Sequence, residues 1–166
     1  MSLDLLGEGF DLHCGGQDLK FPHHENERAQ AVALGKRFAN HWMHHGFVVD
    51  GEGEKMSKSL GNVDNLLDLM EHYDPRAYRM LLLQSHYRGP VTVSQDNIDA
   101  SVKALARFDG VARRFKTPAA AADPAVLDAF RVAMDDDLNT PAAMAIVFDA
   151  ITQANAAADA GDMVRA

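Results

Sequence analysis

Residues 10–30 are FDLHCGGQDLKFPHHENERAQ, and their order predicts a strand, a glycine turn and a helix in quick succession. The composition of Phe10–His13 favours a short strand, which the Gly15-Gly16 pair is expected to end. Proline is tolerated in the first turn of a helix, so Pro22 indicates a helix from about His23 to Leu34. A strand, a glycine turn and a helix make half of a βαβ unit, which indicates an α/β fold.

The residues that follow extend the α/β pattern to about residue 90. Residues 41–50, HWMHHGFVVD, predict one or two strands broken at Gly46, and a loop is expected from Gly51 to Asn62. One or two strands with a covering helix cannot close a parallel-sheet core. We therefore expect a further segment ahead of Met1 in the functional protein, or a partner that supplies it.

The rest of the chain is predicted to be helical. Apolar residues recur at steps of three and four, and breaks such as Gly89-Pro90 separate the helical runs. Residues 117–124, TPAAAADP, are the expected linker. The predicted fold class is therefore α/β followed by all-α. The expected helices lie near residues 66–70 and 75–81, from about Ser94 to Phe115, from about Ala125 to Met134, and from about Pro141 to Ala158.

Composition excludes several classes of protein. The chain has 166 residues, of which 47% are hydrophobic and 24% are charged, as in a folded globular protein. Its net charge of −8 argues against non-specific nucleic-acid binding, although a local basic face can still meet one shaped RNA. No apolar run approaches the ~20 residues of a membrane span, and the N-terminus lacks the pattern of a signal peptide. We expect a cytoplasmic protein that does not bind membranes, and the single cysteine fits a reducing compartment.

The sequence KMSKS at residues 55–59 is the most specific motif. Two lysines and two hydroxyls in a loop flanked by glycines suit a mobile clamp that closes on phosphates and stabilises charge on a leaving group. A solvated basic loop is the structural alternative. A five-residue string of this kind is too specific to favour that alternative.

Together with this motif, several segments resemble cysteinyl-tRNA synthetase, a class I aminoacyl-tRNA synthetase. They are residues 10–30, 41–47 (HWMHHGF), 55–62 (KMSKSLGN), 86–88 (HYR) and 135–143 (DDDLNTPAA). The resemblance implies the second half of a Rossmann-like catalytic domain over residues 1–53. It also implies a KMSKS loop with connecting helices over 54–90 and part of a helical bundle over 91–166. The family's HIGH-type motif and its anticodon-recognition region are not in this sequence, so we expect a fragment that is inactive alone.

The resemblance also implies the chemistry and its residues. The family activates cysteine with ATP and transfers it to its tRNA, which implies cysteine, ATP with Mg²⁺, and tRNA(Cys) as partners of an intact protein expected to be a monomer. Lys58 matches the lysine assigned to ATP, with Lys55 beside it. The charge that accumulates on departing pyrophosphate needs such cations. The resemblance places the ribose of the adenylate near Gly16 and Asp18, and the amino-acid pocket near the two residues His13 and His24.

His23 and Glu27 are candidate metal ligands. They are four residues apart on the predicted helix, so both project from one face, and imidazole and carboxylate are ordinary zinc ligands. From the residues alone, a helix terminus in which Glu27 pairs with a cation is equally plausible. The resemblance implies that they are two of four Zn²⁺ ligands, the others being cysteines outside this chain. Cys14 is not expected to replace them, and zinc should bind the isolated chain weakly or not at all.

Other histidines and cations receive structural roles. We interpret His41, His44 and His45 as mostly structural, His44 being the least certain of them. Three cations of the long predicted helix, Lys103, Arg107 and Arg114, form a stripe that could face tRNA phosphates, although a solvated helix face is the favoured interpretation.

Two alternatives to a cysteine-tRNA ligase stay open. One is a ligase that joins cysteine to an amino sugar in thiol biosynthesis, with the same fold, zinc and KMSKS loop. The other is a non-catalytic remnant that binds tRNA or a partner protein through an exposed sheet edge. The residues around Glu27 and Leu60 match the tRNA enzyme better than the amino-sugar enzyme.

Overall fold

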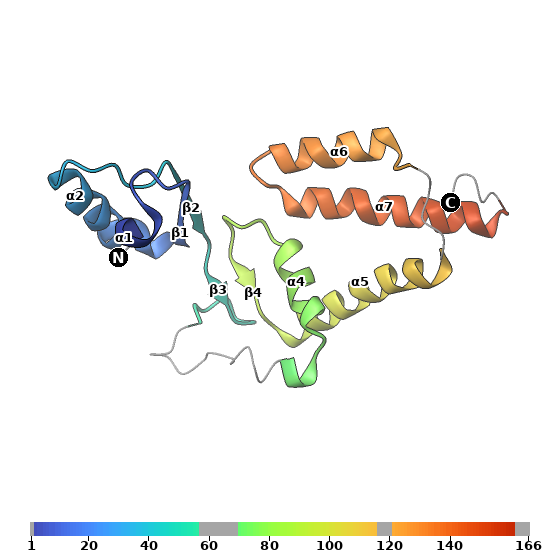
Figure 1. Cartoon of the computed structure of the whole chain (residues 1–166). Helices are drawn as coiled ribbons and strands as arrows, with labels where there is room; N and C mark the ends of the chain where they lie inside the picture. The colour runs from blue at the N-terminus through green and yellow to red at the C-terminus, as the bar shows by residue number, and fades with distance from the viewer. Residues whose placement is uncertain (1, 57–69, 116–120, 162–166) are drawn as a thin grey trace.

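The computed structural model of the chain describes residues 2–56, 70–115 and 121–161, and its elements run from α1 near the N-terminus to α7 near the C-terminus (Figure 1). Two small parallel sheets are followed by a helical half that ends in a long hairpin. In these ranges, no helix combines the length and the apolar character that a membrane crossing requires.

The N-terminal part completes the βαβ unit of which the sequence predicts half, because a second strand pairs in parallel with the first. It comprises α1 (Ser2–Leu6), β1 (Leu12–Gly16), a 3-10 turn (Gln17–Leu19), a π-helical turn (Lys20–His24), α2 (Glu25–Ala33) and β2 (His41–His45). β1 and β2 are parallel, with Leu12 opposite His41 and Gly16 opposite His45. β1 ends at the predicted glycine pair, although it begins at Leu12 and not at Phe10, and both glycines are part of the strand. They pair with β2, and a side chain at either position would meet a neighbouring side chain.

The second sheet joins β3 (Val48–Val49) to β4 (Val91–Thr92), again in parallel, with α4 (Pro75–Leu83) between them in the chain. α4 begins where the sequence predicts, since the Asp74 side chain accepts a hydrogen bond of 2.8 Å from the backbone N–H of Arg76. The strand β4 was not predicted. Two residues directly after Gly89-Pro90 are too few to show an alternating pattern.

The helical half comprises α5 (Gln95–Arg114), α6 (Pro124–Asp135) and α7 (Thr140–Asp159), each within a few residues of its prediction. Side-chain caps from Ser94, Asp123 and Asn139 begin these helices. Most of the helix predicted near residues 66–70 and half of the predicted linker lie outside the described residues.

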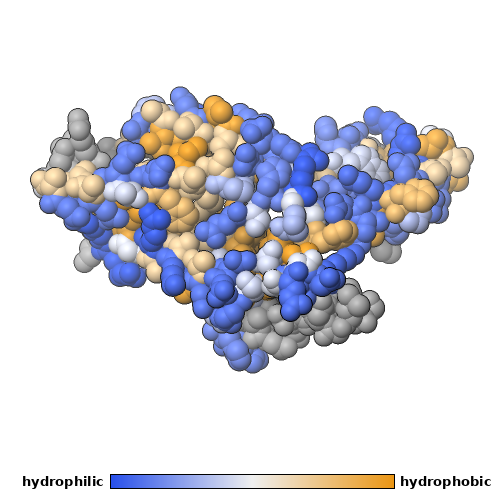
Figure 2. All heavy atoms as spheres, turned by 180° about the vertical axis from the view of Figure 1, so that it is seen from behind, coloured by the Kyte–Doolittle hydropathy of each residue, from blue (hydrophilic) through white to orange (hydrophobic). Residues whose placement is uncertain are grey.

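A thin core joins α4, α5 and α7. Its buried residues are mostly small or aliphatic: Ala77, Met80, Leu81, Ile98, Ala104, Ala143 and Ile151. Apolar side chains also reach the surface over the helical half, as the view from behind shows (Figure 2). Val132 of α6, for example, is 70% exposed.

Two cations of the predicted basic stripe bind α7. Arg107 Nη2 donates to Thr152 Oγ1 at 3.0 Å, and its guanidinium lies 4.6 Å from the centre of the Phe148 ring. Arg114 Nη1 donates to Asn155 Oδ1 at 3.1 Å. These two arginines therefore help to hold α5 against α7.

Candidate functional site

The predicted site residues that the structure describes gather around β1 and the carboxyl ends of β1 and β2. β1 ends in Gly15 and Gly16, and β2 ends beside them in His44 and His45. Ligands of open α/β sheets bind outside the carboxyl ends of the strands. The structure therefore provides a frame for a binding site at the position that the sequence predicts.

Gly15 allows a histidine ring to lie directly on β1. A Cβ atom at this position would be only 2.6 Å from Cε1 of His24. The His24 side chain is buried at 4% exposure, and its Nδ1 shares a hydrogen bond of 2.8 Å with Nε2 of His44. Burial, and then the neighbouring histidines, lower the pKa of His24, and burial also lowers the pKa of His44. Both rings are therefore neutral near pH 7, the form in which imidazole binds metals.

Next to His24, a carboxylate and a second imidazole complete a potential metal site. His13 Nε2 lies 2.9 Å from Glu27 Oε2. One ligand atom each from His13, His24 and Glu27 lies within 4.8 Å of the others. His23, which the sequence analysis predicts as a ligand with Glu27, has its Nε2 3.9 Å from the same carboxylate oxygen and is 60% exposed. Two imidazoles and a carboxylate are a donor set that zinc accepts.

Aromatic rings surround this polar group. The His13 ring packs edge-on against Phe38 and Trp42, with centroid distances of 5.2 and 4.9 Å. Trp42 in turn stacks on His44 with an angle of 6° between the rings. An open cavity of about 360 Å³ lies here, with a volume suited to a small molecule. Its lining residues are Lys20, His24, Glu25, Arg28, Trp42 and His44.

Sequence reasoning missed Trp42 and gave His44 only a structural role. These residues are two apart on β2, and the cavity that both of them line shows that they share one face of the strand. Because side chains alternate along a strand, the sequence HWMHH already places Trp42 and His44 on the same face of β2. The sequence does not show which of the two faces lies toward α2.

The first lysine of the KMSKS motif lies at the same strand ends. Lys55 Nζ forms an ion pair of 2.9 Å with Asp18 Oδ2 and lies 4.2 Å from the centre of the Phe47 ring. This hydrogen bond lowers the pKa of Asp18. Asp18 is held near β1, because a Cβ atom on Gly16 would be 2.5 Å from its Oδ1. Lys58 lies outside the described residues.

Gly15 and Gly16 are neighbours, so the histidine–carboxylate group and the Lys55–Asp18 pair share one strand end. Residues 1–103 match the family model described as the tRNA synthetases class I (C) catalytic domain. The chain belongs to the class I (C) tRNA synthetase family. Residues 129–166 match a second family model, the DALR domain. These matches confirm the predicted order of a class I catalytic segment followed by a helical segment, while the finer boundaries at residues 53 and 90 stay predictions.

Curated relatives cover the chain almost completely. It is 47% identical over 156 residues to a cysteine–tRNA ligase of Ectopseudomonas mendocina, an alignment that covers 93% of this chain and 34% of the relative. It is 48% identical over 159 residues to a cysteine–tRNA ligase of Thermus thermophilus, an alignment that covers 89% of this chain and 33% of the relative. The chain thus spans about a third of the length of these relatives.

Solved structures of other aminoacyl-tRNA synthetases support the architecture. A leucyl-tRNA synthetase of Agrobacterium radiobacter K84, in a ternary complex with tRNA and LeuAMS, superposes with a TM-score of 0.76 at 17% identity, over 93% of this chain and 23% of that one. Methionyl-tRNA synthetase of Mycobacterium tuberculosis, in complex with methionyl-adenylate, gives 0.62 at 22% identity, over 93% and 37% of the two chains. At these identities the likeness shows the fold alone.

Proposed function

We propose that this chain is the cysteine- and ATP-handling segment of a cysteine–tRNA ligase, which activates cysteine with ATP and then transfers it to tRNA(Cys). The observation that carries the proposal is the convergence of two groups on one strand end. His13, His24 and Glu27 can hold a metal, and Lys55 is anchored on Asp18 beside them. The names of the curated relatives support the same conclusion.

In this proposal the histidine–carboxylate group of His13, His24 and Glu27 recognises the side chain of cysteine. Zinc, when bound, supplies a soft Lewis acid that prefers a thiol sulfur to the hydroxyl oxygen of serine. Glu27 is a ligand in either arrangement of the site. His23 is the partner predicted from the sequence, and His13 and His24 are the imidazoles that the described geometry brings within reach. The rings of Trp42 and Phe38 form an aromatic wall beside the same place.

The second group acts on ATP. The ribose is proposed to lie near Gly16 and Asp18, and the phosphates, with Mg²⁺, near Lys55 and Lys58. When the carboxylate of cysteine attacks the α-phosphate, negative charge accumulates on the departing pyrophosphate. Lysines placed around it stabilise that charge. Lys55 must leave Asp18, or share it with the nucleotide, in order to do so.

The metal half of the proposal is tested on the chain itself by calorimetric titration with zinc, because the structure brings three ligand atoms together where the sequence analysis predicts two and therefore expects weak binding or none. Wild-type chain and Glu27→Gln are compared, with Glu25→Gln as the matched control, because Glu25 lines the cavity but lies outside the metal group. We expect E27Q to weaken zinc binding at least about tenfold and E25Q to leave it unchanged. Equal zinc affinity in all three proteins would contradict the assigned site.

The ligase activity is tested in a hybrid enzyme, in which this chain replaces the matching third of the Thermus thermophilus relative. We expect the hybrid to form cysteinyl-tRNA and to leave an amino sugar unligated. Ligation of the amino sugar instead would favour the alternative ligase. A folded hybrid that binds tRNA(Cys) but charges it with no amino acid would favour the non-catalytic alternative. Cytoplasmic location and a monomeric state stay predictions.

A further inference from the structure

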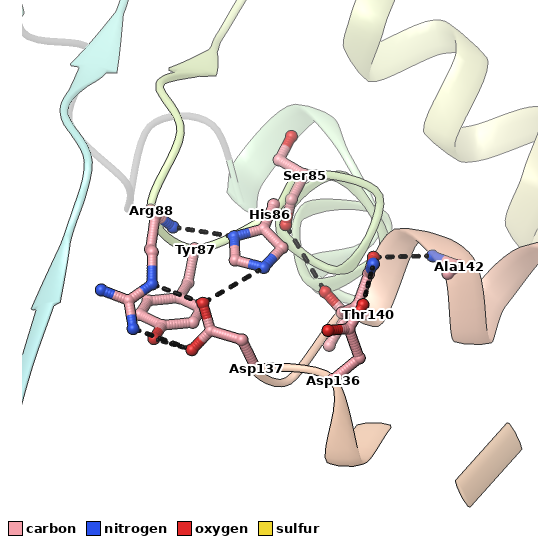
Figure 3. A network of polar contacts seen from close by, with 9 residues as sticks. Ser85, His86, Tyr87, Arg88, Asp136, Asp137, Thr140 and Ala142 are labelled. Atoms are coloured by element: carbon pink, nitrogen blue, oxygen red, sulfur yellow. Dashed lines mark hydrogen bonds and ion pairs between the residues drawn. The ribbon is translucent and has the colours of Figure 1, made fainter. Parts of the chain in front are cut away.

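One carboxylate joins the helical hairpin to the α/β part of the molecule. Asp137 Oδ1 accepts hydrogen bonds from Tyr87 Oη at 2.6 Å and from Arg88 Nη2 at 2.8 Å, while its Oδ2 accepts from Arg88 Nε at 2.5 Å (Figure 3). His86 Nε2 lies 3.9 Å from the same Oδ2. A forked guanidinium–carboxylate contact of this kind fixes orientation as well as distance.

The backbone at Asp137 is strained, which shows that its surroundings determine it closely. Asp137 and Leu138, in the turn between α6 and α7, both have φ of +54°, a left-handed conformation that residues with side chains rarely adopt. Two such residues in succession are maintained only where contacts hold them. The contacts of Asp137 with Tyr87 and Arg88 supply that restraint.

The residues that Asp137 contacts lie at the junction of the two sheets, where Gly46 meets Tyr87 and Gly89. We call this junction the seam. The backbone carbonyl of Tyr87 accepts a hydrogen bond of 2.7 Å from the N–H of Gly46, at the junction of β2 and β3. Gly46 and Gly89 approach so closely that a Cβ atom on Gly46 would be 2.0 Å from the Gly89 carbonyl oxygen. Beyond this point, the N–H of Val91 donates to the carbonyl of Phe47 at 2.8 Å.

On the far side of the seam, the segment that carries Lys55 lies against β3. β3 forms an antiparallel bridge from Val49 to Lys55, and the N–H of Met56 donates to the carbonyl of Val48 at 2.9 Å. The described contacts therefore run without a gap from Asp137, through Tyr87 and Gly46, to the backbone of Lys55.

We propose that Asp137 is a positioning residue for Lys55. Through this carboxylate, the helical hairpin fixes the position of the seam, and the seam in turn fixes the backbone of Lys55, the first lysine of the KMSKS motif. The part that Lys55 plays in the reaction rests on the proposed function. The chain of contacts from Asp137 to the backbone of Lys55 does not depend on the proposed function, so the catalytic role of Lys55 and these contacts are tested separately.

The link is tested by amide hydrogen exchange of the 166-residue chain. Asp137→Asn keeps the shape of the side chain and removes its charge. Asp136→Asn is the matched control, because among the described residues the side chain of Asp136, in the same turn, accepts only a long hydrogen bond of 3.4 Å from Asn139. We expect D137N to accelerate exchange of the Gly46, Val91 and Met56 amides about tenfold or more, and D136N to leave them within about twofold of wild type. Acceleration confined to residues 135–142 would overturn the proposal.

A milder variant covers the case in which D137N destabilises the whole chain. Tyr87→Phe removes one of the donors to Asp137 and leaves the Arg88 ion pair in place. We expect a smaller acceleration at the same seam amides, with the interior of α7 unchanged. An equal acceleration throughout α7 would show a general loss of stability and would overturn the proposal.

The hybrid enzyme provides the catalytic readout. We expect D137N in the hybrid to raise the KM for ATP several-fold while the KM for cysteine stays the same, because Lys55 is displaced and the cysteine side of the site is not. An equal change in the KM for ATP and the KM for cysteine would overturn the positioning role. An inactive parent hybrid would count against the proposed function. Amide hydrogen exchange of the isolated chain would still show whether Asp137 stabilises the backbone at the seam.

Discussion

Substitution of Gly46 by alanine tests the close approach of the two sheets. The added Cβ atom would lie 2.0 Å from the carbonyl oxygen of Gly89 and 2.5 Å from its carbonyl carbon. Both are backbone atoms, so relief requires the loop before β4 to move. Gly46 is not among the glycines with positive φ, so the expected cost is steric and not conformational.

The magnitude follows from two opposing effects. Overpacking costs about 1–3 kcal/mol, and a clash with backbone belongs at the upper end of that range. Alanine also restricts the unfolded chain, which offsets about 0.4–1 kcal/mol. The net loss is about 2 kcal/mol in the free energy of unfolding, or about 4–8 °C in Tm for a chain of this size.

Thermal unfolding followed by circular dichroism measures this effect, with Gly110→Ala as the matched control. Gly110 lies within α5, where a Cβ atom would meet only Arg113 Nη2 at 4.0 Å. Alanine there should stabilise the chain by about 0.5–1 kcal/mol, because glycine is a poor helix former. The same substitution is thus expected to have opposite signs at the two positions. If the Gly46→Ala protein is as stable as the Gly110→Ala protein, the close approach of Gly46 to the Gly89 carbonyl is refuted.

Two further predictions concern the turn between α6 and α7. Asn139→Ala should lower the free energy of unfolding by about 1 kcal/mol, measured by urea titration, because the Asn139 side chain caps α7 by accepting a hydrogen bond from the Ala142 N–H; an unchanged midpoint would show that the cap contributes nothing. Arg88 and then Tyr87 hold the pKa of Asp137 well below its usual range. A lowered pKa in the folded state contributes stability above the unfolded-state value of about 3.9, and that stability is lost as the pH falls below it. Wild type should therefore be more stable than D137N at pH 7, and the difference should shrink from pH 4 downward; a difference that persists undiminished at pH 2 would contradict this assignment.

The helical half was predictable from the sequence because its signals are local. Asp74-Pro75 and Asn139-Thr140 combine a capping side chain with the start of an apolar period of three and four residues. In the structure, the side chains of Asp74 and Asn139 cap these two helices. Each signal lies within a few residues of the helix that it begins.

The contacts that assemble the site depend on residues far apart in the chain. Lys55 and Asp18 are separated by 37 positions, and His13 and Glu27 by 14. No local pattern pairs them, although the family resemblance assigned most of them to one site. In the acidic run at residues 135–137, nothing in the sequence distinguishes Asp137 from its neighbours. Only the position of Arg88 in the fold does so.

The most direct test of the central claim is ATP–pyrophosphate exchange by the hybrid enzyme, with cysteine and serine compared as substrates. This half-reaction uses the residues that this chain contributes and does not require tRNA. We expect exchange that depends on cysteine, is lost in the E27Q hybrid, and is absent with serine at the same concentration. Exchange that proceeds equally with serine, or that survives E27Q undiminished, would contradict the assignment of this strand end as the cysteine and ATP site.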